Sequence, residues 1–177
     1  MRRSQIVPTG FEKTFRDDEL IVSKTDPTGR ITYANDLFVR LAGYSRSELM
    51  GAPHSIVRHP DMPRGIFKFL WDTLATGNEV FAIVKNLSSN GDHYWVLAHV
   101  SPTFGPDGRI IGHHSNRRTA LRSSIRVLEP IYALMCKEEE RHGKAAGADA
   151  SIPILMAELK ARRTTYANLM FGTEEAA

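Results

Sequence analysis

The fold of this chain is decided by residues 84–96, which read VKNLSSNGDHYWV. The dipeptide Asn90-Gly91 lies between two apolar runs, and it is the strongest short-range signal for a tight β-hairpin. The stretch therefore predicts a strand over residues 79–87 that turns and pairs with a second strand over residues 93–104.

Neighbouring side chains on these two strands point to opposite faces of the sheet, so one assignment fixes the others. Both faces are largely apolar, whereas a sheet that is covered on one side only carries polar residues on its outer face. We therefore expect cover on both faces, from short helices on the inner one and from the N-terminal segment, the C-terminal helix or a second copy on the outer one. The first strand presents these residues to the presumed inner face: Val80, Ala82, Val84 and Asn86.

Turn and cap signals predict the remaining elements of the domain. Further strands are expected at residues 19–23, 30–33 and 109–117. Helices are expected from Asn35, over residues 45–50, and from Pro63 to about Gly77. This order predicts an α+β domain with one five-stranded antiparallel sheet and short helices on one face.

The two ends of the chain differ in kind from this domain, which spans residues 19–118. Residues 1–18 lack sustained periodicity and are expected to form an irregular N-terminal cap. Apolar residues three or four apart predict an amphipathic helix over residues 119–142. The small, Gly/Ala-rich stretch 143–151 is expected to be a linker, and residues 152–177 a second helix, opened by Pro153, and a tail.

The composition is that of an ordinary soluble globular protein, with 42% apolar and 24% charged residues. Lys and Arg number 23 against 20 Asp and Glu, a balance that does not favour nucleic-acid binding. No apolar run approaches the roughly 18 residues of a membrane span, and no signal peptide follows Met1. We therefore expect a cytoplasmic protein.

Enzyme motifs are missing from the sequence. No paired C-x-x-C, H-E-x-x-H or Gly-rich phosphate loop occurs, and no nucleophile–base arrangement is recognisable. The single cysteine, Cys136, excludes an intramolecular disulfide. The chain is therefore not expected to be an enzyme.

Residues 58–63, RHPDMP, are the second informative stretch, because they hold a guanidinium, an imidazole and a carboxylate in a segment with two prolines. Together with residues 33–36 (YAND), Gly43-Tyr44 and residues 84–96, they resemble the sensory PAS domain of bacterial aerotaxis receptors. The resemblance covers residues 19–118. It implies the PAS fold, here with a C-terminal helical extension, and a non-covalent FAD between the inner sheet face and the helices. It also implies a flavoprotein sensor of redox or oxygen status in aerotaxis- or chemotaxis-like signal transduction.

Several residues are candidates for contacting that cofactor. Asn86 offers a hydrogen-bond donor and an acceptor to the pyrimidine edge of a flavin. Arg58 can bind phosphate through charge-assisted hydrogen bonds, with His59 and Asp61 orienting the segment. Asn35 resembles a pocket residue of the aerotaxis family.

Three further candidates lie on the long helix and on the strands. Trp71 is expected to be a core residue of its helix rather than a redox relay. Val80 stands where the aerotaxis family usually has a tryptophan. His114 stands where light-sensing relatives carry the glutamine that contacts the reactive flavin edge, and an imidazole there can change its proton state with flavin reduction.

Two alternatives remain open from the sequence. The many histidines, among them 54, 59, 93, 99, 113 and 114, could supply an axial ligand to haem in a gas sensor. A cofactor-free PAS module that serves only dimerisation suits the valine at position 80. In each case we expect a homodimer through the outer sheet face and the helical extensions, and a separate signalling partner such as a chemoreceptor or kinase.

Overall fold

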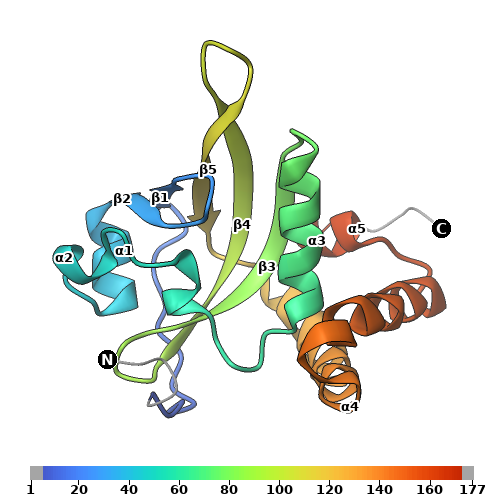
Figure 1. Cartoon of the computed structure of the whole chain (residues 1–177). Helices are drawn as coiled ribbons and strands as arrows, with labels where there is room; N and C mark the ends of the chain where they lie inside the picture. Colours follow the sequence, from blue (N-terminus) through green and yellow to red (C-terminus); the bar gives the residue numbers. More distant parts are fainter. Residues whose placement is uncertain (1–5, 173–177) are drawn as a thin grey trace.

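The computed structural model describes residues 6–172 and contains one five-stranded antiparallel sheet with the strand order β2-β1-β5-β4-β3 (Figure 1). The expected α+β architecture is thereby confirmed, with strand boundaries shifted by up to two residues. The strands are β1 (Ile21–Thr25), β2 (Ile31–Ala34), β3 (Val80–Leu87), β4 (His93–Phe104) and β5 (Ile110–Arg118).

Short helices connect β2 to β3 and begin where the sequence signals them. Asn35 caps α1 (Asp36–Ala42) by accepting a hydrogen bond from the Phe38 N–H group. Ser45 and Glu48 form a capping box at α2 (Arg46–Leu49), as the sequence predicts. A short 3-10 helix, η2 (His54–Val57), and the longer α3 (Arg64–Ala75) follow, and no sequence signal had indicated η2.

The hairpin register assigns the sheet faces as expected. β3 pairs with β4 so that Val84 opposes Val96 and Asn86 opposes Tyr94. The even-numbered residues of both strands face the short helices, where they join a continuous buried core with residues such as Phe38, Ile66 and Leu74. The sheet and the short helices thus enclose one side of the domain.

After β5 the chain forms α4 (Arg122–Ala161) and α5 (Tyr166–Phe171). We call these two helices together the C-terminal hairpin. α4 is interrupted only at Gly143, whose φ of 70° and ψ of −171° break the helix into two limbs. The expected linker over 143–151 is therefore wrong as secondary structure, because all of it except Gly143 is helical. The expected helix start at Pro153 is wrong for the same reason, since Pro153 lies inside α4. Alanine favours helix, and a side chain at Gly147 would come within 2.7 Å of the Glu139 carbonyl oxygen, so small residues let the limbs approach closely.

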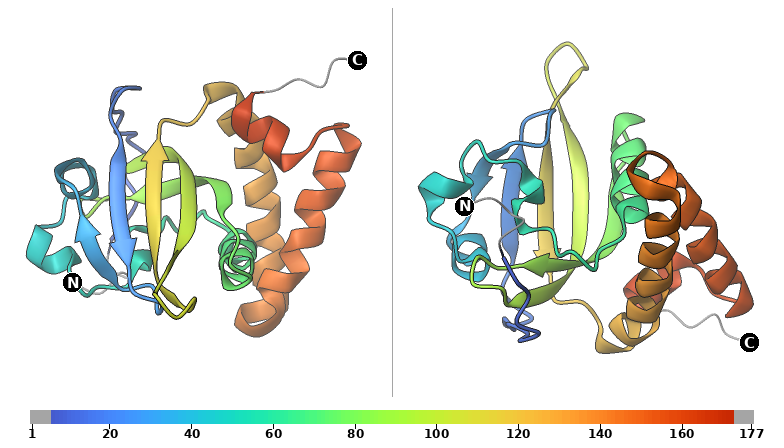
Figure 2. Two further views of the ribbon diagram at one scale, coloured as in Figure 1. Left: turned by 90° about the horizontal axis from the view of Figure 1, so that it is seen from above. Right: turned by 60° about the horizontal axis from the view of Figure 1, so that its bottom comes forward.

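The C-terminal hairpin covers the β3 edge of the sheet and packs beside α3 (Figure 2). At this edge the Ile83 N–H donates to Tyr166 Oη at 3.2 Å, and Tyr132 Oη donates to the Ile83 carbonyl at 2.9 Å. The two tyrosine hydroxyl oxygens are 2.6 Å apart. Because Tyr132 donates its proton to the Ile83 carbonyl, Tyr166 is the donor between the two hydroxyls, and a closed ring of hydrogen bonds results. The edge strand is therefore not open for further pairing here.

The outer face of the sheet is covered in part by the chain itself. The N-terminal segment runs beside the start of β4, where Glu12 pairs with His93. Trp95 of β4 lies against Tyr132 of α4, with ring centroids 6.5 Å apart. Of the three covers expected for this face, the N-terminal segment and the C-terminal helix both contribute.

Candidate cofactor pocket

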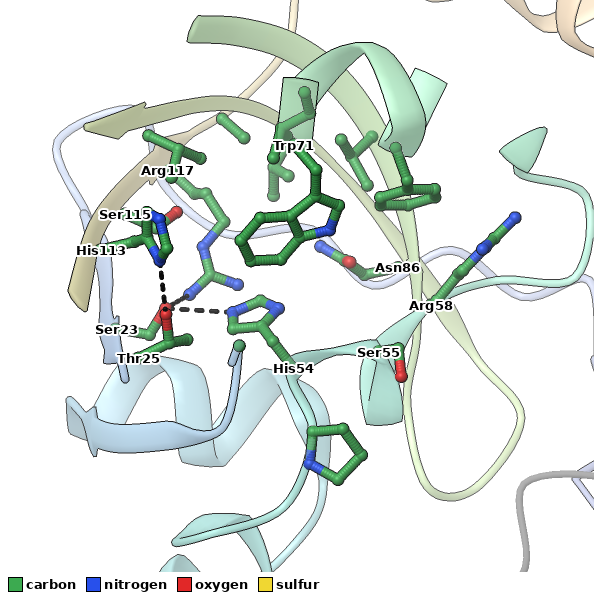
Figure 3. A pocket seen from close by; sticks show the side chains of 18 of the residues that line it. Ser23, Thr25, His54, Ser55, Arg58, Trp71, Asn86, His113, Ser115 and Arg117 are labelled. Carbon is green, nitrogen blue, oxygen red and sulfur yellow. Dashed lines mark hydrogen bonds between the residues drawn. The ribbon is translucent and has the colours of Figure 1, made fainter. Parts of the chain in front are cut away.

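A cavity of about 280 Å³ lies between the inner sheet face and the helices η2 and α3 (Figure 3). The sheet contributes alternate residues of four strands, which follows from the period of two along each strand. Apolar groups dominate the walls, and the polar groups converge from three directions. The polar and aromatic lining residues include Ser23, Thr25, His54, Ser55, Arg58, Phe67, Trp71, Asn86, His113, Ser115 and Arg117.

The buried Ser23 and Arg117 and the half-buried His54 form a polar cluster at one end of the cavity (Figure 3). Arg117 Nη2 donates to Ser23 Oγ at 2.5 Å, and His54 Nε2 lies 3.1 Å from the same oxygen. Burial, together with the nearby Arg117 charge, lowers the pKa of His54 from 6.5 to about 3. The imidazole is therefore neutral at physiological pH and can form a hydrogen bond with the Ser23 hydroxyl.

Arg117 carries a buried positive charge without a carboxylate beside it among residues 6–172. Its residue is 2% exposed, and burial lowers its pKa from 12.5 to about 10, so it remains protonated at neutral pH. The guanidinium lies 4.3 Å from the Phe38 ring centroid, but Nε and Nη1 find no hydrogen-bond partner in the described chain. Buried donors of this kind are costly unless something accepts from them.

Asn86 supplies a third unpaired donor from the middle of the cavity wall (Figure 3). The residue is 4% exposed, and its Nδ2 has no acceptor within the described residues. Asn86 and Arg117, which both line the cavity, together carry three buried N–H-bearing atoms without acceptors among the described residues. Such an arrangement suits a flat ligand that carries hydrogen-bond acceptors along its edge.

Trp71 of α3 lies across the mouth of the cavity (Figure 3) and is 40% exposed. Its ring contacts His113 edge to face, with centroids 5.1 Å apart. A side chain at Gly29 would come within 3.2 Å of the indole, and the φ of 81° there also favours glycine. Trp71 thus lines the cavity, and the expectation that it is a core residue is wrong.

The structure brings together some of the residues singled out in the sequence and leaves others outside. Arg58, Trp71 and Asn86 line the cavity. Val80 faces inward but is packed in the core beyond the cavity, and Asn35 uses its side chain to cap α1 and to bind the Leu20 and Val22 backbone.

His59 and Asp61 also lie outside the cavity lining, where they organise the segment that carries Arg58. The Asp61 N–H donates to His59 Nδ1 at 3.1 Å, and the Asp61 carboxylate lies 3.1 Å from Lys85 Nζ. These contacts fit an orienting role for both residues rather than contact with a ligand in the cavity.

His114 is wrongly placed by the sequence prediction, since it points to the outer face of the sheet. It opposes Ser101 of β4 and binds Asn116 on its own strand. The neighbouring His113 lines the cavity instead. The pairing of β4 with β5 shifts by one residue between Thr103 and Phe104, and such a shift exchanges the two faces.

Sequence reasoning missed Ser23 and Arg117, two informative polar residues of the cavity, and named His54 only as one of several possible haem ligands. Arg117 stands beside Arg118 in the sequence, and nothing in this basic pair by itself indicates burial. Alternation along β5 does separate the two arginines, so that one is buried and the other exposed. That alternation was the available signal, but it could not say which arginine points inward.

An antiparallel sheet with short helices across one face and a polar-rimmed cavity between them is the architecture of the PAS class of sensor domain. Comparison with sequence families agrees, because the family described as PAS fold matches residues 21–113. The chain belongs to the PAS family.

Several characterised proteins share part of this sequence. The aerotaxis receptor of Escherichia coli is 47% identical over 116 residues, which are 66% of this chain and 23% of the receptor. A nitrogen fixation regulatory protein of Klebsiella pneumoniae is 30% identical over 50% of this chain and 18% of its own length. The chain thus spans less than a quarter of either relative.

Solved structures resemble the fold at low sequence identity. A light-oxygen-voltage domain studied with a flavin analogue has a TM-score of 0.55 at 19% identity, over 71% of this chain and 90% of that one. A PAS domain from Colwellia psychrerythraea has a TM-score of 0.52 at 20% identity, over 56% of this chain and 85% of that one. These likenesses support the fold alone.

Two further features, a membrane-spanning helix and a metal-binding group, are absent from residues 6–172. No helix there has the length and apolarity needed to cross a membrane. In the same part of the chain, no group of three or more His, Cys, Asp or Glu side chains is arranged to hold a metal ion.

Proposed function

We propose that this PAS domain binds a flavin, in the form of FAD, and senses redox or oxygen status without catalysing a reaction of its own. The observation that carries the proposal is the set of unpaired buried donors on Asn86 and Arg117 in an otherwise apolar cavity. The isoalloxazine ring is flat, largely apolar and rich in acceptors along its pyrimidine edge. The 47% identity to an aerotaxis receptor supports the same reading.

Each polar residue has a distinct role in this proposal. Asn86 Nδ2 donates to an edge acceptor, and the neutral His54 with Ser23 fixes the position of the Arg117 guanidinium. Arg117 adds a positive charge, which favours any form of the bound group that carries negative charge. A bound flavin supplies a ring whose charge and protonation change on reduction. Arg58, at the other end of the cavity from Arg117, is the residue proposed to bind the phosphates (Figure 3).

The signalling side of the proposal follows the family. We propose a cytoplasmic protein that acts on a separate partner, a chemoreceptor or kinase, in an aerotaxis-like response. Dimerisation through the exposed part of the outer sheet face and the helical extension is part of the same proposal. The signal requires two arrangements of the domain that differ in affinity for the partner.

An absorption spectrum of the purified full chain tests the cofactor. Flavin bands that bleach with dithionite and return in air are the expected result, and release of the cofactor by heat identifies FAD against FMN by chromatography. A Soret band indicates haem instead. A colourless protein from cofactor-replete cells, which also fails to bind added FAD, overturns the proposal.

Two substitutions test the site against matched controls. Asn86→Ala and Arg58→Ala should each weaken FAD binding by about tenfold, since each removes a hydrogen-bonding or charged contact. Asn78→Ala and Arg109→Ala change the same residue types at exposed positions and should leave affinity unchanged. Equal affinity in all four variants contradicts the assignment of the cavity. Thermal unfolding confirms that the core remains folded.

A further inference from the structure

The segment from Arg58 to Gly65 separates the cavity from the C-terminal hairpin and contacts both. On the cavity side, Arg58 Nη2 donates to the Met62 carbonyl at 2.9 Å, and the guanidinium lies 4.4 Å from the Phe67 ring centroid. On the opposite side, the backbone of the segment and the first turn of α3 meet α4. One short piece of chain is therefore shared by the candidate ligand site and the hairpin.

Glu139 of α4 makes the main contact on the hairpin side. Its carboxylate accepts from the Arg64 N–H at 2.8 Å, from Arg64 Nε at 3.0 Å and from the Gly65 N–H at 2.8 Å. It also accepts from Ser151 Oγ of the second limb at 2.8 Å. Glu139 therefore ties both limbs of α4 to the start of α3.

The start of α3 has no cap within its own segment, which explains the need for Glu139. Pro63 occupies the N-cap position and makes no side-chain hydrogen bond to the helix. The first N–H groups of a helix lack intrahelical acceptors, and a carboxylate is the most favourable partner at that end. Glu139 supplies this cap from another helix and is only 4% exposed.

Other contacts in the same interface also bear on residues 58–65. Cys136 Sγ donates to the Asp61 carbonyl at 3.3 Å. Lys85 Nζ lies 3.1 Å from Asp61 and 3.2 Å from Glu129 of α4, and so joins the segment to the helix a second time. The segment is thus joined to the hairpin directly at its backbone by Glu139 and Cys136, and indirectly through Lys85 of β3 and the Asp61 side chain.

We propose that Glu139 is a positioning residue for the cofactor pocket, and that the C-terminal hairpin is coupled through it to cofactor occupancy. A docked hairpin holds residues 58–65 in the arrangement that presents Arg58 to the cavity. By thermodynamic linkage, a bound cofactor stabilises the docked hairpin by the same factor. The inference rests on the proposed function, because Arg58 must contact the bound FAD for the coupling to exist.

The test compares Glu139→Gln with Glu140→Gln in the full chain, with FAD as the probe. Glu140 is the exposed next residue of the same helix and is the matched control. Glu139→Gln should raise the Kd for FAD by about tenfold, within the usual range of coupling between two sites. Glu140→Gln should leave the Kd unchanged.

Hydrogen exchange of the amides in α4 and α5 gives the reciprocal readout. In the parent chain FAD should slow their exchange, and in Glu139→Gln this dependence on FAD should be lost. A purely structural Glu139 gives a different result, because exchange then rises equally with and without FAD and the Kd stays constant. That result overturns the inference.

The outcomes separate the two proposals. A parent chain that binds FAD, with equal Kd values for both variants, overturns the coupling and leaves the flavin site intact. A parent chain that binds no FAD overturns both. If Glu139→Gln does not fold, Ser151→Ala replaces it, since this change removes one donor to Glu139 and leaves α3 untouched. It should raise the Kd by about threefold, as expected for one lost hydrogen bond, and an unchanged Kd overturns the inference.

Discussion

The protein contains two polar clusters, one in the cavity around Arg117 and one in the hairpin interface around Glu139. They differ in how many of their hydrogen-bonding groups have partners. Glu139 accepts hydrogen bonds from Arg64, Gly65 and Ser151. Arg117 makes one hydrogen bond, to Ser23, and leaves Nε and Nη1 without acceptors in the described chain.

The difference separates a structural contact from a ligand site. A buried charge with a full set of partners stabilises the arrangement that supplies them, and removing one partner is costly. A buried charge with missing partners lowers the stability of the ligand-free protein, and a ligand that supplies acceptors recovers that free energy. The comparison therefore predicts effects of opposite sign for substitutions in the two clusters.

Arg117→Met should give the largest effect. It should weaken FAD binding by about 100-fold, the scale for losing a buried charged contact. It should also raise the free energy of unfolding of the FAD-free chain by about 1 kcal/mol, because an incompletely paired buried charge is replaced by an apolar group. FAD titration and urea unfolding measure the two quantities.

Arg118→Met is the control for this substitution, since Arg118 is the exposed neighbour on the same strand. It should change neither quantity. A loss of stability in the FAD-free Arg117→Met chain, with FAD affinity retained, would make Arg117 a stabilising residue that does not contact the cofactor, and would remove the contrast.

Gly65→Ala should lower the free energy of unfolding by about 2 kcal/mol through overpacking of the hairpin interface. The new Cβ would meet Ser151 Oγ and lie 2.9 Å from the Ala148 carbonyl oxygen. Alanine by itself favours the helix by about 1 kcal/mol over glycine, so a net loss must come from the hairpin. Urea unfolding measures the change.

Gly65→Ala combined with Ser151→Ala sharpens this test. The second substitution removes the nearest clashing atom, so the pair should destabilise by less than the sum of the single changes. Strict additivity would mean that the methyl group does not meet the hairpin.

Lowering the pH should reduce the free energy of unfolding by up to about 1.4 kcal/mol per pH unit through His54. The pKa of His54 is about 3 in the folded chain against an ordinary 6.5. Between these values the unfolded chain binds a proton that the folded chain does not, so stability falls as the pH falls from 6.5 towards 3. Urea unfolding of the FAD-free chain across this range measures the slope.

His54→Gln should flatten that slope, whereas His142→Gln, at an exposed position on α4, should not. The Glu139 cluster responds at lower pH. Burial raises the pKa of that carboxyl, but hydrogen bonds from Arg64, Gly65 and Ser151 outweigh it and leave the pKa below 4.5. Its stabilisation is therefore present above 4.5 and is lost as the pH falls through the lower folded-state value. Identical dependence of stability on pH in His54→Gln and His142→Gln would contradict the assignment of the slope to His54.

Tyr166→Phe should have the smallest effect, a loss of about 1 kcal/mol for one hydroxyl in a hydrogen-bonded ring. The Ile83 N–H loses its acceptor and Tyr132 Oη loses a donor. Hydrogen exchange should show faster opening of the Ile83 amide. Tyr33→Phe, at an exposed position on β2, should leave exchange at Ile83 unchanged, and equal effects of the two would discount the ring.

Much of the fold could be predicted because its signals are local. The turn residues around Asn90-Gly91 predict the β3–β4 hairpin, and alternation along β3 predicts which side of the sheet Asn86 faces. The same reasoning fails for β5, because a one-residue shift in its pairing with β4 exchanges His113 and His114 between the faces. No residue type in that turn announces the shift.

The sequence by itself determined the PAS class, the β3–β4 hairpin and its faces, and the helix caps at Asn35 and Ser45. It also identified Arg58 and Asn86 as candidate cofactor contacts. These follow from turn chemistry, alternation and short motifs, which act over a few residues. Only the tertiary structure decided that Arg117 lines the cavity with Nε and Nη1 lacking acceptors in the described chain, and that Glu139 caps a helix that begins 75 residues earlier. Both depend on which groups remain without partners after packing, and that is a property of contacts distant in the chain.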